Sequence, residues 1–206
     1  MIKAVIFDYG NVISLPQDGS DARAMSALTG IPADFFAAPH QEFRADFDRG
    51  IIDGITLYRC LLESRGRHDL AGDPALLTRL AELEGASWDT LNQDVVAWAL
   101  ELRRGGLKLG VLSNMPHEFL ARHERDIPVF TAADYACFSC RVGLIKPEPE
   151  IYWNCLAGLA VAPEEAVFFD DLPENIAEAQ ELGIHGILWA GLDAAKLAWK
   201  KLLKKT

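Results

Sequence analysis

Five short, almost continuously apolar runs recur along this chain, with segments of helical spacing beside most of them. A strand that is apolar at nearly every position is typical of a parallel sheet covered on both faces, because neither face of such a strand meets water. Strands that alternate with helices predict a doubly wound α/β sheet. The expected strands are residues 3–7, 108–112, 135–138, 166–169 and 186–189. The expected helices beside them are residues 116–125, 150–159, 173–182 and 193–201.

One long segment interrupts the alternation directly after the first strand. From about Leu15 to Glu101 we recognise no strand pattern, and a polar break at 66–74 divides the segment. We therefore expect an α/β core domain formed by residues 1–14 and 105–206, and an all-helical cap domain formed by residues 15–104. Such an insertion would lie above the sheet, on the side where the carboxyl ends of the strands open. Its expected helices are residues 21–28, 33–48, 55–65, 74–84 and 94–104.

The 206 residues carry a formal net charge of −10, which disfavours nucleic acid as a partner. No apolar run approaches the roughly 18 residues of a membrane span. Because the chain enters its first strand pattern at once, we expect no signal peptide, no membrane association and a cytoplasmic location. The basic run from Lys196 to Lys205 contains interleaved leucines and is expected to be the solvated face of a last helix. These patterns specify no oligomeric state.

The four cysteines include a C-x-x-C pair, Cys137 and Cys140. In a cytoplasmic protein such thiols are expected to be reduced. The chain has no second pair to complete a zinc site, and the surrounding letters YACFSC resemble a strand. We therefore expect buried structural thiols at both positions.

Polar residues stand at the carboxyl ends of several expected strands, which is where α/β sheets bind their ligands. Taken singly, such residues are typical of helix caps and turns. Their joint position at one edge of the sheet instead predicts a functional site. They are Asp8 after the first strand, Ser113 and Asn114 after the second, and Asp170 and Asp171 after the fourth.

Carboxylates that converge at one edge would repel one another unless a cation joined them. Hard oxygen ligands suit Mg²⁺, which keeps several waters and bridges to phosphate. Lys146, in the segment GLIKPEPEIY, adds a positive charge at the same edge. A lysine charge and a serine hydroxyl near backbone N–H groups suit a phosphate group. The pattern therefore predicts a site for magnesium and phosphate.

Four segments in this order, FDYGNV, LSN, GLIKPEPEIY and FFDDLPEN, resemble the four motifs of the haloacid dehalogenase (HAD) superfamily. The resemblance covers essentially the whole chain. The D-x-G-N-V form of the first motif, with its helical insertion, is similar to bacterial glucose-1-phosphate phosphatase-like proteins and to the phosphatase domain of soluble epoxide hydrolases. The resemblance implies a Rossmann-like core and a cap that closes over the site and selects the substrate.

The resemblance also implies a role for each acidic motif residue. Asp8 would be the nucleophile that takes the phosphoryl group as an aspartyl-phosphate, and it would also bind Mg²⁺. The backbone carbonyl of Gly10 and the carboxylate of Asp171 would complete the protein ligands of the metal. Asp170 and Asn175 would support these ligands from behind.

The phosphate group, by the same resemblance, would be held by the Ser113 hydroxyl and the backbone of Asn114. Lys146 would neutralise both Asp8 and the transferring group. Most phosphatases of this superfamily resemble a D-x-D pattern, in which the second Asp protonates the leaving oxygen and later activates water. Gly10 stands at that position here.

The expected function is an Mg²⁺-dependent phosphatase for a small phosphorylated metabolite, with sugar phosphates as the leading class. One alternative is a 2-haloacid dehalogenase, which shares the fold and the Asp nucleophile, although such enzymes lack the acidic pair Asp170 and Asp171. The other is a catalytically weak binding protein on the same fold, which Gly10 keeps open. Six cap residues are expected to be mostly part of the cap's own core: Phe35, Phe36, His40, Phe43, Arg44 and Phe47.

Overall fold

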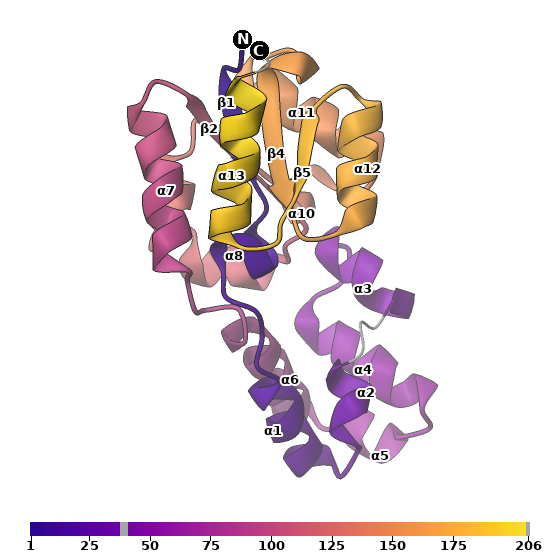
Figure 1. Ribbon diagram of the computed structural model, residues 1–206. Coiled ribbons are helices and arrows are strands. Elements are labelled where there is room, and N and C mark those ends of the chain that lie inside the picture. The colour runs from indigo at the N-terminus through magenta and orange to yellow at the C-terminus, as the bar shows by residue number, and fades with distance from the viewer. Residues whose placement is uncertain (38–40, 205–206) are drawn as a thin grey trace.

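The computed structural model describes residues 1–37 and 41–204, and a five-stranded parallel sheet lies within its larger domain (Figure 1). The strand order β3-β2-β1-β4-β5 confirms the doubly wound α/β core. Strands β2 and β3 are added on one side of the central strand β1, and β4 and β5 on the other. The strand order therefore reverses between β1 and β4, and sheets of this kind bind ligands at that point. The strands are β1 (Ala4–Phe7), β2 (Lys108–Ser113), β3 (Tyr135–Phe138), β4 (Ala166–Asp170) and β5 (His185–Leu188).

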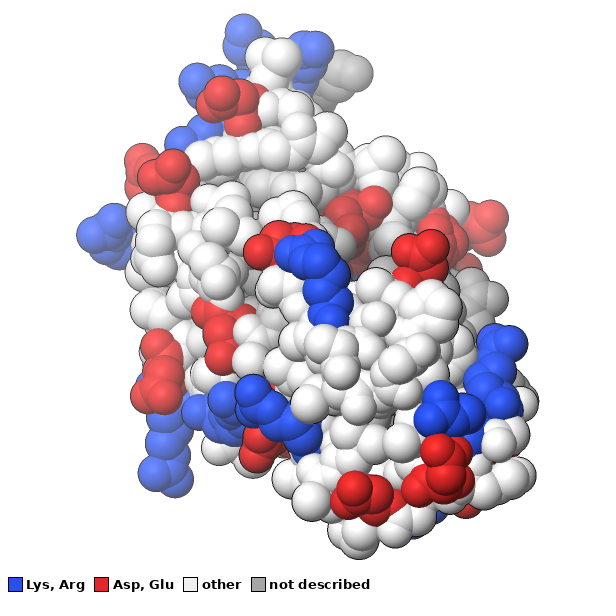
Figure 2. Space-filling view, turned by 90° about the horizontal axis from the view of Figure 1, so that it is seen from below, with Lys and Arg blue, Asp and Glu red and all other residues white. Residues whose placement is uncertain are grey.

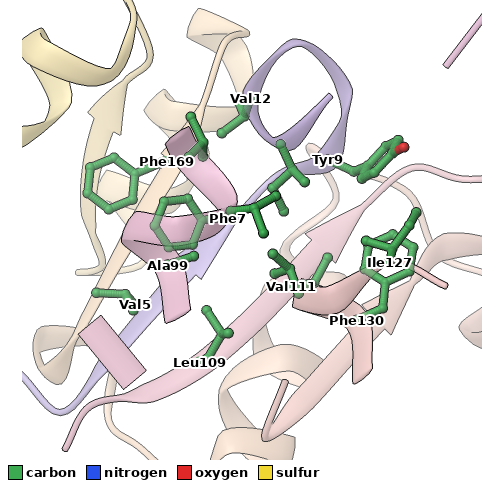
Figure 3. Packing of buried hydrophobic residues seen from close by; sticks show 14 of the residues in the cluster. Val5, Phe7, Tyr9, Val12, Ala99, Leu109, Val111, Ile127, Phe130 and Phe169 are labelled. Atoms are coloured by element: carbon green, nitrogen blue, oxygen red, sulfur yellow. The ribbon is translucent and has the colours of Figure 1, made fainter. Parts of the chain in front are cut away.

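Alternate residues of β1 face the two layers of covering helices, as the pleat of a strand requires. Val5 and Phe7 belong to the cluster shared with α7 and α13, whereas Ala4 and Ile6 belong to the cluster shared with α11 and α12. Figure 3 shows the first cluster, in which the rings of Phe7 and Phe169 stack 5.0 Å apart between centroids. The helices are α7 (Gln93–Arg104), α8 (His117–His123), α9 (Pro128–Ala132), α11 (Pro149–Leu159), α12 (Pro173–Glu181) and α13 (Leu192–Leu203).

The helical segment after β1 forms a cap beyond the carboxyl ends of the strands (Figure 1). Its buried residues, Met25, Leu57 and Leu80 among them, make a cluster separate from the two clusters on the sheet. The two linkers between cap and core run side by side and pair at Ser14 and Leu91. The cap helices are α1 (Ser20–Thr29), α2 (Ala33–Ala37), α3 (Gln41–Asp48), α4 (Gly54–Ser64), α5 (His68–Ala71) and α6 (Pro74–Ala86).

Helix α7 packs on the sheet, contrary to the expectation that residues up to 104 belong to the cap. Its Trp98 and Ala99 lie in the same buried cluster as Phe7, and the rings of Trp98 and Phe7 meet edge to face at 5.6 Å between centroids. The sequence pattern did not reveal this packing, because an amphipathic pattern identifies a helix without identifying the surface that its apolar face covers. We propose that the cap ends ahead of α7, at about Asn92.

Two cap segments also differ in detail from the expected helices. The helix expected at 33–48 is described as α2 and α3, while residues 38–40, and with them His40, lie outside the described residues. The expected polar break at 66–74 contains the short helix α5, which one turn of residues suffices to form.

The strand expected through YACFSC ends at Phe138, and Cys140 lies in the short helix α10 (Ser139–Val142). Cys137 and Cys140 are both buried. Burial raises the pKa of the Cys140 thiol to about 11 and that of the Cys137 thiol to about 12, so both stay protonated near neutral pH. Protonated, buried thiols agree with the structural role expected from the sequence.

Charged side chains of both signs are interspersed over the face seen from the cap side (Figure 2). On α13, Lys200 and Lys201 are exposed while Ala195 and Trp199 are buried, and Lys204 directly after the helix is exposed too, as expected for a solvated basic face on a last helix. Lys205 lies outside the described residues. Within the described ranges no helix combines the length and the apolar character needed to cross a bilayer.

We expect Gly158→Ala, in α11, to lower the free energy of unfolding by about 1–3 kcal/mol, the usual cost of overpacking. An added Cβ would lie 2.4 Å from ring atoms of Tyr135. That ring cannot swing away freely, because its hydroxyl donates to Asn154 Oδ1 at 2.7 Å. Denaturant unfolding of the wild-type and variant proteins measures the change.

The control is the same substitution in a Tyr135→Ala background, where the intrinsic preference of helices for alanine over glycine, about 1 kcal/mol, should make it neutral or stabilising. A Gly158→Ala protein more stable than the wild type would contradict the packing argument.

Candidate active site

Strand β1 brings Asp8 to the edge of the sheet, and its neighbours hold it there. The N–H of Asp8 donates to the Phe169 carbonyl of β4 at 2.9 Å, and the Oδ1 atom accepts from the N–H of Tyr9 at 2.7 Å. A wide π-type turn, Tyr9–Ile13, follows at once. Within it Asn11 has φ 55°, a left-handed conformation that asparagine adopts more readily than most residues. The Asp8 carboxylate is thereby fixed at the C-terminal end of β1.

Lys146 lies between two of the carboxylates. Its Nζ is 2.8 Å from Asp8 Oδ1 and 2.7 Å from Asp170 Oδ2, and the residue is only 4% exposed. Burial by itself would lower the pKa of Lys146, but the two carboxylates outweigh burial and raise it. The side chain is therefore an ammonium ion that bridges the ends of β1 and β4.

Asn114 positions Lys146 through a pair of hydrogen bonds. The backbone N–H of Lys146 donates to Asn114 Oδ1 at 2.8 Å, and Asn114 Nδ2 donates to the Lys146 carbonyl at 3.1 Å. The sequence analysis expected Asn114 to act through its backbone, and this use of its side chain was not foreseen. Nothing in the letters LSN shows that the amide will pair with a peptide group 32 positions away.

The adjacent carboxylates of Asp170 and Asp171 have different surroundings. Asp170 is fully buried, and besides Lys146 it accepts from Asn175 Nδ2 at 3.0 Å and from the N–H of Leu172 at 2.8 Å. Asp171 is partly buried, and its Oδ2 accepts from Asn11 Nδ2 at 2.8 Å. Burial raises the pKa of Asp171 and the Asn11 hydrogen bond opposes that rise. Asn11 is a site residue that sequence analysis missed, although its place in DYGNV was a usable signal.

Ser113, the last residue of β2, is buried beside Asp8. Burial raises the pKa of Asp8, the charge of Lys146 lowers it, and the charge of Asp170 raises it again. A hydrogen bond from Ser113 adds a smaller lowering effect. The structure thus brings Asp8, Ser113 and Lys146 into one site with the acidic pair.

The donor set fits a hard divalent cation such as Mg²⁺. Ligand oxygens of Asp8, Asp170 and Asp171 lie within 4.8 Å of one another. Carboxylate oxygens are the ligands that Mg²⁺ prefers, and it is usually held by one or two of them together with water and phosphate. Both oxygens of Asp170 already accept hydrogen bonds, and Asp170 does not line the cavity. Asp8 and Asp171 do line it, so their carboxylates are the ones that face a ligand.

A cavity of about 510 Å³ opens between the cap and the core, a volume suited to a small-molecule ligand. The core contributes Asp8, Gly10, Asn11, Ser113, Asn114, Lys146, Asp171 and Asn175 to its lining. The cap contributes Asp21, Phe36, Arg44, Phe47, Asp48 and Glu84. The expected site residues therefore share one chamber with cap side chains, and Asp170 supports it from behind.

The cap residues singled out in the sequence divide between two roles. Phe36 and Phe47 are buried in the cap's own cluster and also reach the cavity, while Phe35 and Phe43 pack against that cluster. Arg44 also lines the cavity, in keeping with the expectation that most, but not all, of these residues serve the cap's own core.

Trp88, just after α6, covers the position of Gly10. A Cβ added at Gly10 would lie 3.3 Å from Cζ3 of the Trp88 ring, which is tight contact. The hydroxyl of Tyr9 donates to the Trp88 carbonyl at 2.7 Å and holds this segment beside the first motif. Trp88 was not foreseen as a site residue, because it is 78 positions from Gly10 in the sequence and belongs to no motif.

The cap is also fastened to the core beside Lys146. Arg49 forms an ion pair with Glu148, with Nη1 at 2.9 Å from Oε2, and Glu148 Oε2 also accepts from the N–H of Ile145 at 3.0 Å. The N–H of Gly54 donates to Glu118 of α8 at 2.6 Å. The segment that carries Lys146 is thereby held by the cap as well as by the core.

The site combines a strand-end aspartate with a lysine that bridges it to an acidic pair. A helical cap covers the cavity that they share. This arrangement is that of a hydrolase with an α/β core. The chain belongs to the haloacid dehalogenase-like hydrolases, whose family model matches residues 2–183. This confirms the superfamily to which its four motifs were matched.

The sequence is similar to proteins of several organisms. It is 46% identical over 202 residues to bifunctional epoxide hydrolase 2 of Rattus norvegicus, covering 91% of this chain and 36% of that protein. It is 31% identical over 193 residues to acyl-CoA dehydrogenase family member 10 of Mus musculus, covering 90% of this chain but 18% of that protein. The chain thus spans less than two thirds of the length of these relatives. It is 26% identical over 199 residues to phosphatase MT3486 of Mycobacterium tuberculosis, covering 91% of this chain and 87% of that protein.

Solved structures share the fold. A HAD family enzyme of Bacteroides thetaiotaomicron, crystallised with magnesium and inorganic phosphate, has a TM-score of 0.73 at 20% identity, covering 96% of this chain and 99% of that chain. The L-2-haloacid dehalogenase of Xanthobacter autotrophicus has a TM-score of 0.69 at 21% identity, covering 93% of this chain and 79% of that chain. The fold therefore occurs both in an enzyme crystallised with magnesium and phosphate and in a dehalogenase, so the reaction of this chain has to be argued from its site.

Proposed function

We propose that this hydrolase is an Mg²⁺-dependent phosphatase that acts on a small phosphorylated metabolite through an aspartyl-phosphate on Asp8. The observation that carries the proposal is the set of charges around Asp8. Lys146 bridges Asp8 and Asp170, and the Asp171 carboxylate lies within metal-sharing distance of both. This set suits a dianionic phosphate better than a neutral substrate, because a lysine and a bound cation both attract negative charge.

In the proposed first step, an Asp8 oxygen attacks phosphorus and the bond from phosphorus to the ester oxygen breaks, so that the leaving group departs as its alkoxide or aryloxide and takes a proton from water. In the second step, water attacks the phosphorus of the aspartyl-phosphate and releases inorganic phosphate and the Asp8 carboxylate. Lys146 stabilises the added negative charge in both steps. The Ser113 hydroxyl and the Asn114 backbone orient the phosphate oxygens.

Asp8, the Gly10 carbonyl and Asp171 would hold the metal, with Asp170 and Asn175 behind them. The difference between the two adjacent carboxylates supports this division, because Asp171 faces the cavity and Asp170 is engaged with Lys146 and Asn175. The bound ion would supply positive charge that draws the phosphate toward Asp8.

The acidic pair is the feature that favours a phosphatase over a 2-haloacid dehalogenase. Besides Asp170, which pairs with Lys146, the acidic pair supplies Asp171 as a second carboxylate that faces the cavity and suits a metal ion. Relatives of this chain include phosphatase MT3486 and validoxylamine A 7′-phosphate phosphatase of Streptomyces hygroscopicus. A purely binding role is disfavoured by the paired and oriented Lys146, which a binding protein has no need to keep buried.

We expect Asp8→Asn to reduce phosphatase kcat to below a few per cent of the wild-type value, because an amide is neither a nucleophile nor an anionic ligand. Release of inorganic phosphate measures the loss, and thermal unfolding checks that the fold is intact. Asp69→Asn, an exposed cap carboxylate, is the control and should keep full activity. Substantial turnover by the Asp8→Asn protein would rule out Asp8 as the nucleophile.

Activity should disappear on chelation with EDTA and return with added Mg²⁺. Asp171→Asn should weaken Mg²⁺ binding, which calorimetry can follow without any turnover, since it removes one anionic ligand. The matched control is Glu174→Gln, an exposed carboxylate at the start of α12. Unchanged Mg²⁺ affinity in Asp171→Asn would contradict its role as a ligand, and activity that persists in EDTA would favour the dehalogenase alternative.

Rates should fall steeply as the pKa of the leaving alcohol rises, because Gly10 cannot protonate the leaving oxygen and such assistance is worth about 10²–10⁴-fold. A series of aryl phosphates measures the dependence. Gly10→Asp should flatten it when combined with Trp88→Ala, which removes the ring 3.3 Å from the new Cβ. The backbone at Gly10, φ −60° and ψ 133°, accepts any residue.

Gly10→Asn with Trp88→Ala is the control, since it has a similar side chain without an acidic proton. If the wild-type rates prove insensitive to the leaving group, another general acid operates in the site.

A further inference from the structure

The cap lines the cavity with more negative than positive charge. Among the residues whose side chains the structure describes, the cap carboxylates that line the cavity are Asp21, Asp48 and Glu84, and the cap guanidinium is that of Arg44; these residues lie in helices α1, α3 and α6. The side chain of Asp48 is 10% exposed and that of Glu84 15% exposed, so water screens them poorly. This wall is chemically distinct from the lysine and metal end of the cavity.

The guanidinium of Arg44 is already engaged by the carboxylates of the same wall. Its Nε donates to both oxygens of Asp48, at 3.0 and 3.1 Å, and its Nη1 donates to Glu84 Oε1 at 2.6 Å. The hydroxyl of Tyr58 donates to the other oxygen of Glu84 at 2.9 Å. These charge-assisted bonds are the strong ones in proteins, so the positive charge of Arg44 is largely balanced within the wall itself.

The wall therefore treats donors and anions differently. Hydroxyl and ammonium groups can donate to a carboxylate, which has about four acceptor sites over its two oxygens, so an oxygen that already accepts one bond can accept another. A second phosphate or a carboxylate would instead face a wall in which three carboxylates outnumber one guanidinium, and like-charge juxtaposition is a recognised way of rejecting wrong ligands. The aromatic rings of Phe36, Phe47 and Trp88 leave apolar surface for the carbon skeleton.

We propose that Asp21, Asp48 and Glu84 select phosphate monoesters whose alcohol part carries hydrogen-bond donors and no second anionic group. The inference rests on the proposed phosphatase function and deepens it by naming the substrate class. The cavity of about 510 Å³ has room for such a monoester up to the size of a sugar phosphate.

Matched substrate pairs test this selection. Glycerol 3-phosphate is compared with 3-phosphoglycerate, and glucose 1-phosphate with glucuronic acid 1-phosphate, so that each pair differs by a carboxylate far from the phosphate. We expect kcat/KM to favour the first member of each pair at least tenfold. Equal rates, or a preference for the carboxylate-bearing member, would overturn the inference.

The variants Glu84→Gln and Asp21→Asn should reduce the ratio of the two kcat/KM values in each pair about threefold or more. They should do so by raising kcat/KM for the member with the extra carboxylate relative to the member without it. Glu82→Gln is the matched control on α6, because its carboxylate pairs with Arg79 and is exposed, and it should leave the ratio unchanged. Asp21→Asn disturbs none of the contacts of Arg44, so it remains informative if Glu84→Gln destabilises the cap. A loss that is equal for both members in both variants would overturn the selective role.

Binding separates this inference from the proposed function. Calorimetric titration of the same pairs into the Asp8→Asn protein with Mg²⁺ measures the preference without turnover, and we expect at least a tenfold difference in Kd. If the wild type hydrolyses p-nitrophenyl phosphate but does not prefer the members without the extra carboxylate, the inference about the cap is refuted and the phosphatase function is not. If the wild type does not hydrolyse p-nitrophenyl phosphate but the expected difference in Kd is found, the phosphatase function is refuted and selection by the cap is supported.

Discussion

A buried ammonium between two carboxylates is the interaction on which the site depends. Lys146 is 4% exposed and lies within 2.8 Å of oxygens of Asp8 and Asp170, so none of the three charges is isolated from an opposite one. Removing one partner of a buried ion pair typically costs about 3–5 kcal/mol, because the remaining charge is left desolvated. The two carboxylates end neighbouring strands, in which Phe7 pairs with Phe169. The sheet register and the charge balance of the site therefore depend on one another.

The contacts of the cap reach that same centre. The ion pair between Arg49 and Glu148 joins the cap to the segment that carries Lys146, and Glu148 also accepts from the backbone of Ile145. The Asp48 carbonyl accepts from the Ser139 hydroxyl at 2.5 Å in the adjoining part of the core. The cap therefore makes direct contacts with the segment that places the lysine and with the adjoining part of the core.

Two properties of the cavity bear on the substrates of the proposed phosphatase. Gly10 stands where a D-x-D motif would place an acid. Trp88 packs over this position, so the absence of a side chain at Gly10 is matched by the packing around it. Across the cavity, Arg44 is engaged by Asp48 and Glu84 and leaves the cap wall acidic. A phosphate ester with a good leaving group and a donor-rich alcohol satisfies both conditions.

Much of the core could be predicted from the sequence because its signals are local. Runs such as AVIF and AVFFD are apolar on both faces, which is the requirement of a parallel strand between two helical layers, and each ends at a carboxylate. The ordered motifs then placed Asp8, Ser113, Lys146 and Asp171 at one edge, because all parallel strands present their carboxyl ends together. The predicted start of α6 was correct where proline and an aspartate cap marked it, at Pro74 after Asp73, whereas the short helix α9, which also begins at a proline, was not predicted.

Other features were decided only by the tertiary structure, because they depend on partners far apart in the chain. Helix α7 has an amphipathic pattern that fits either domain, and its contact with Phe7 assigns it to the sheet. Asn11 finds Asp171 across 160 positions, and Arg44 finds Glu84 across 40. No local pattern encodes such pairs, since a polar side chain specifies what it can bond to but the fold determines which group comes within reach. The sequence by itself thus determined the strands, their order of motifs and the kind of chemistry, while three-dimensional packing determined how the cap wall is charged and what covers Gly10.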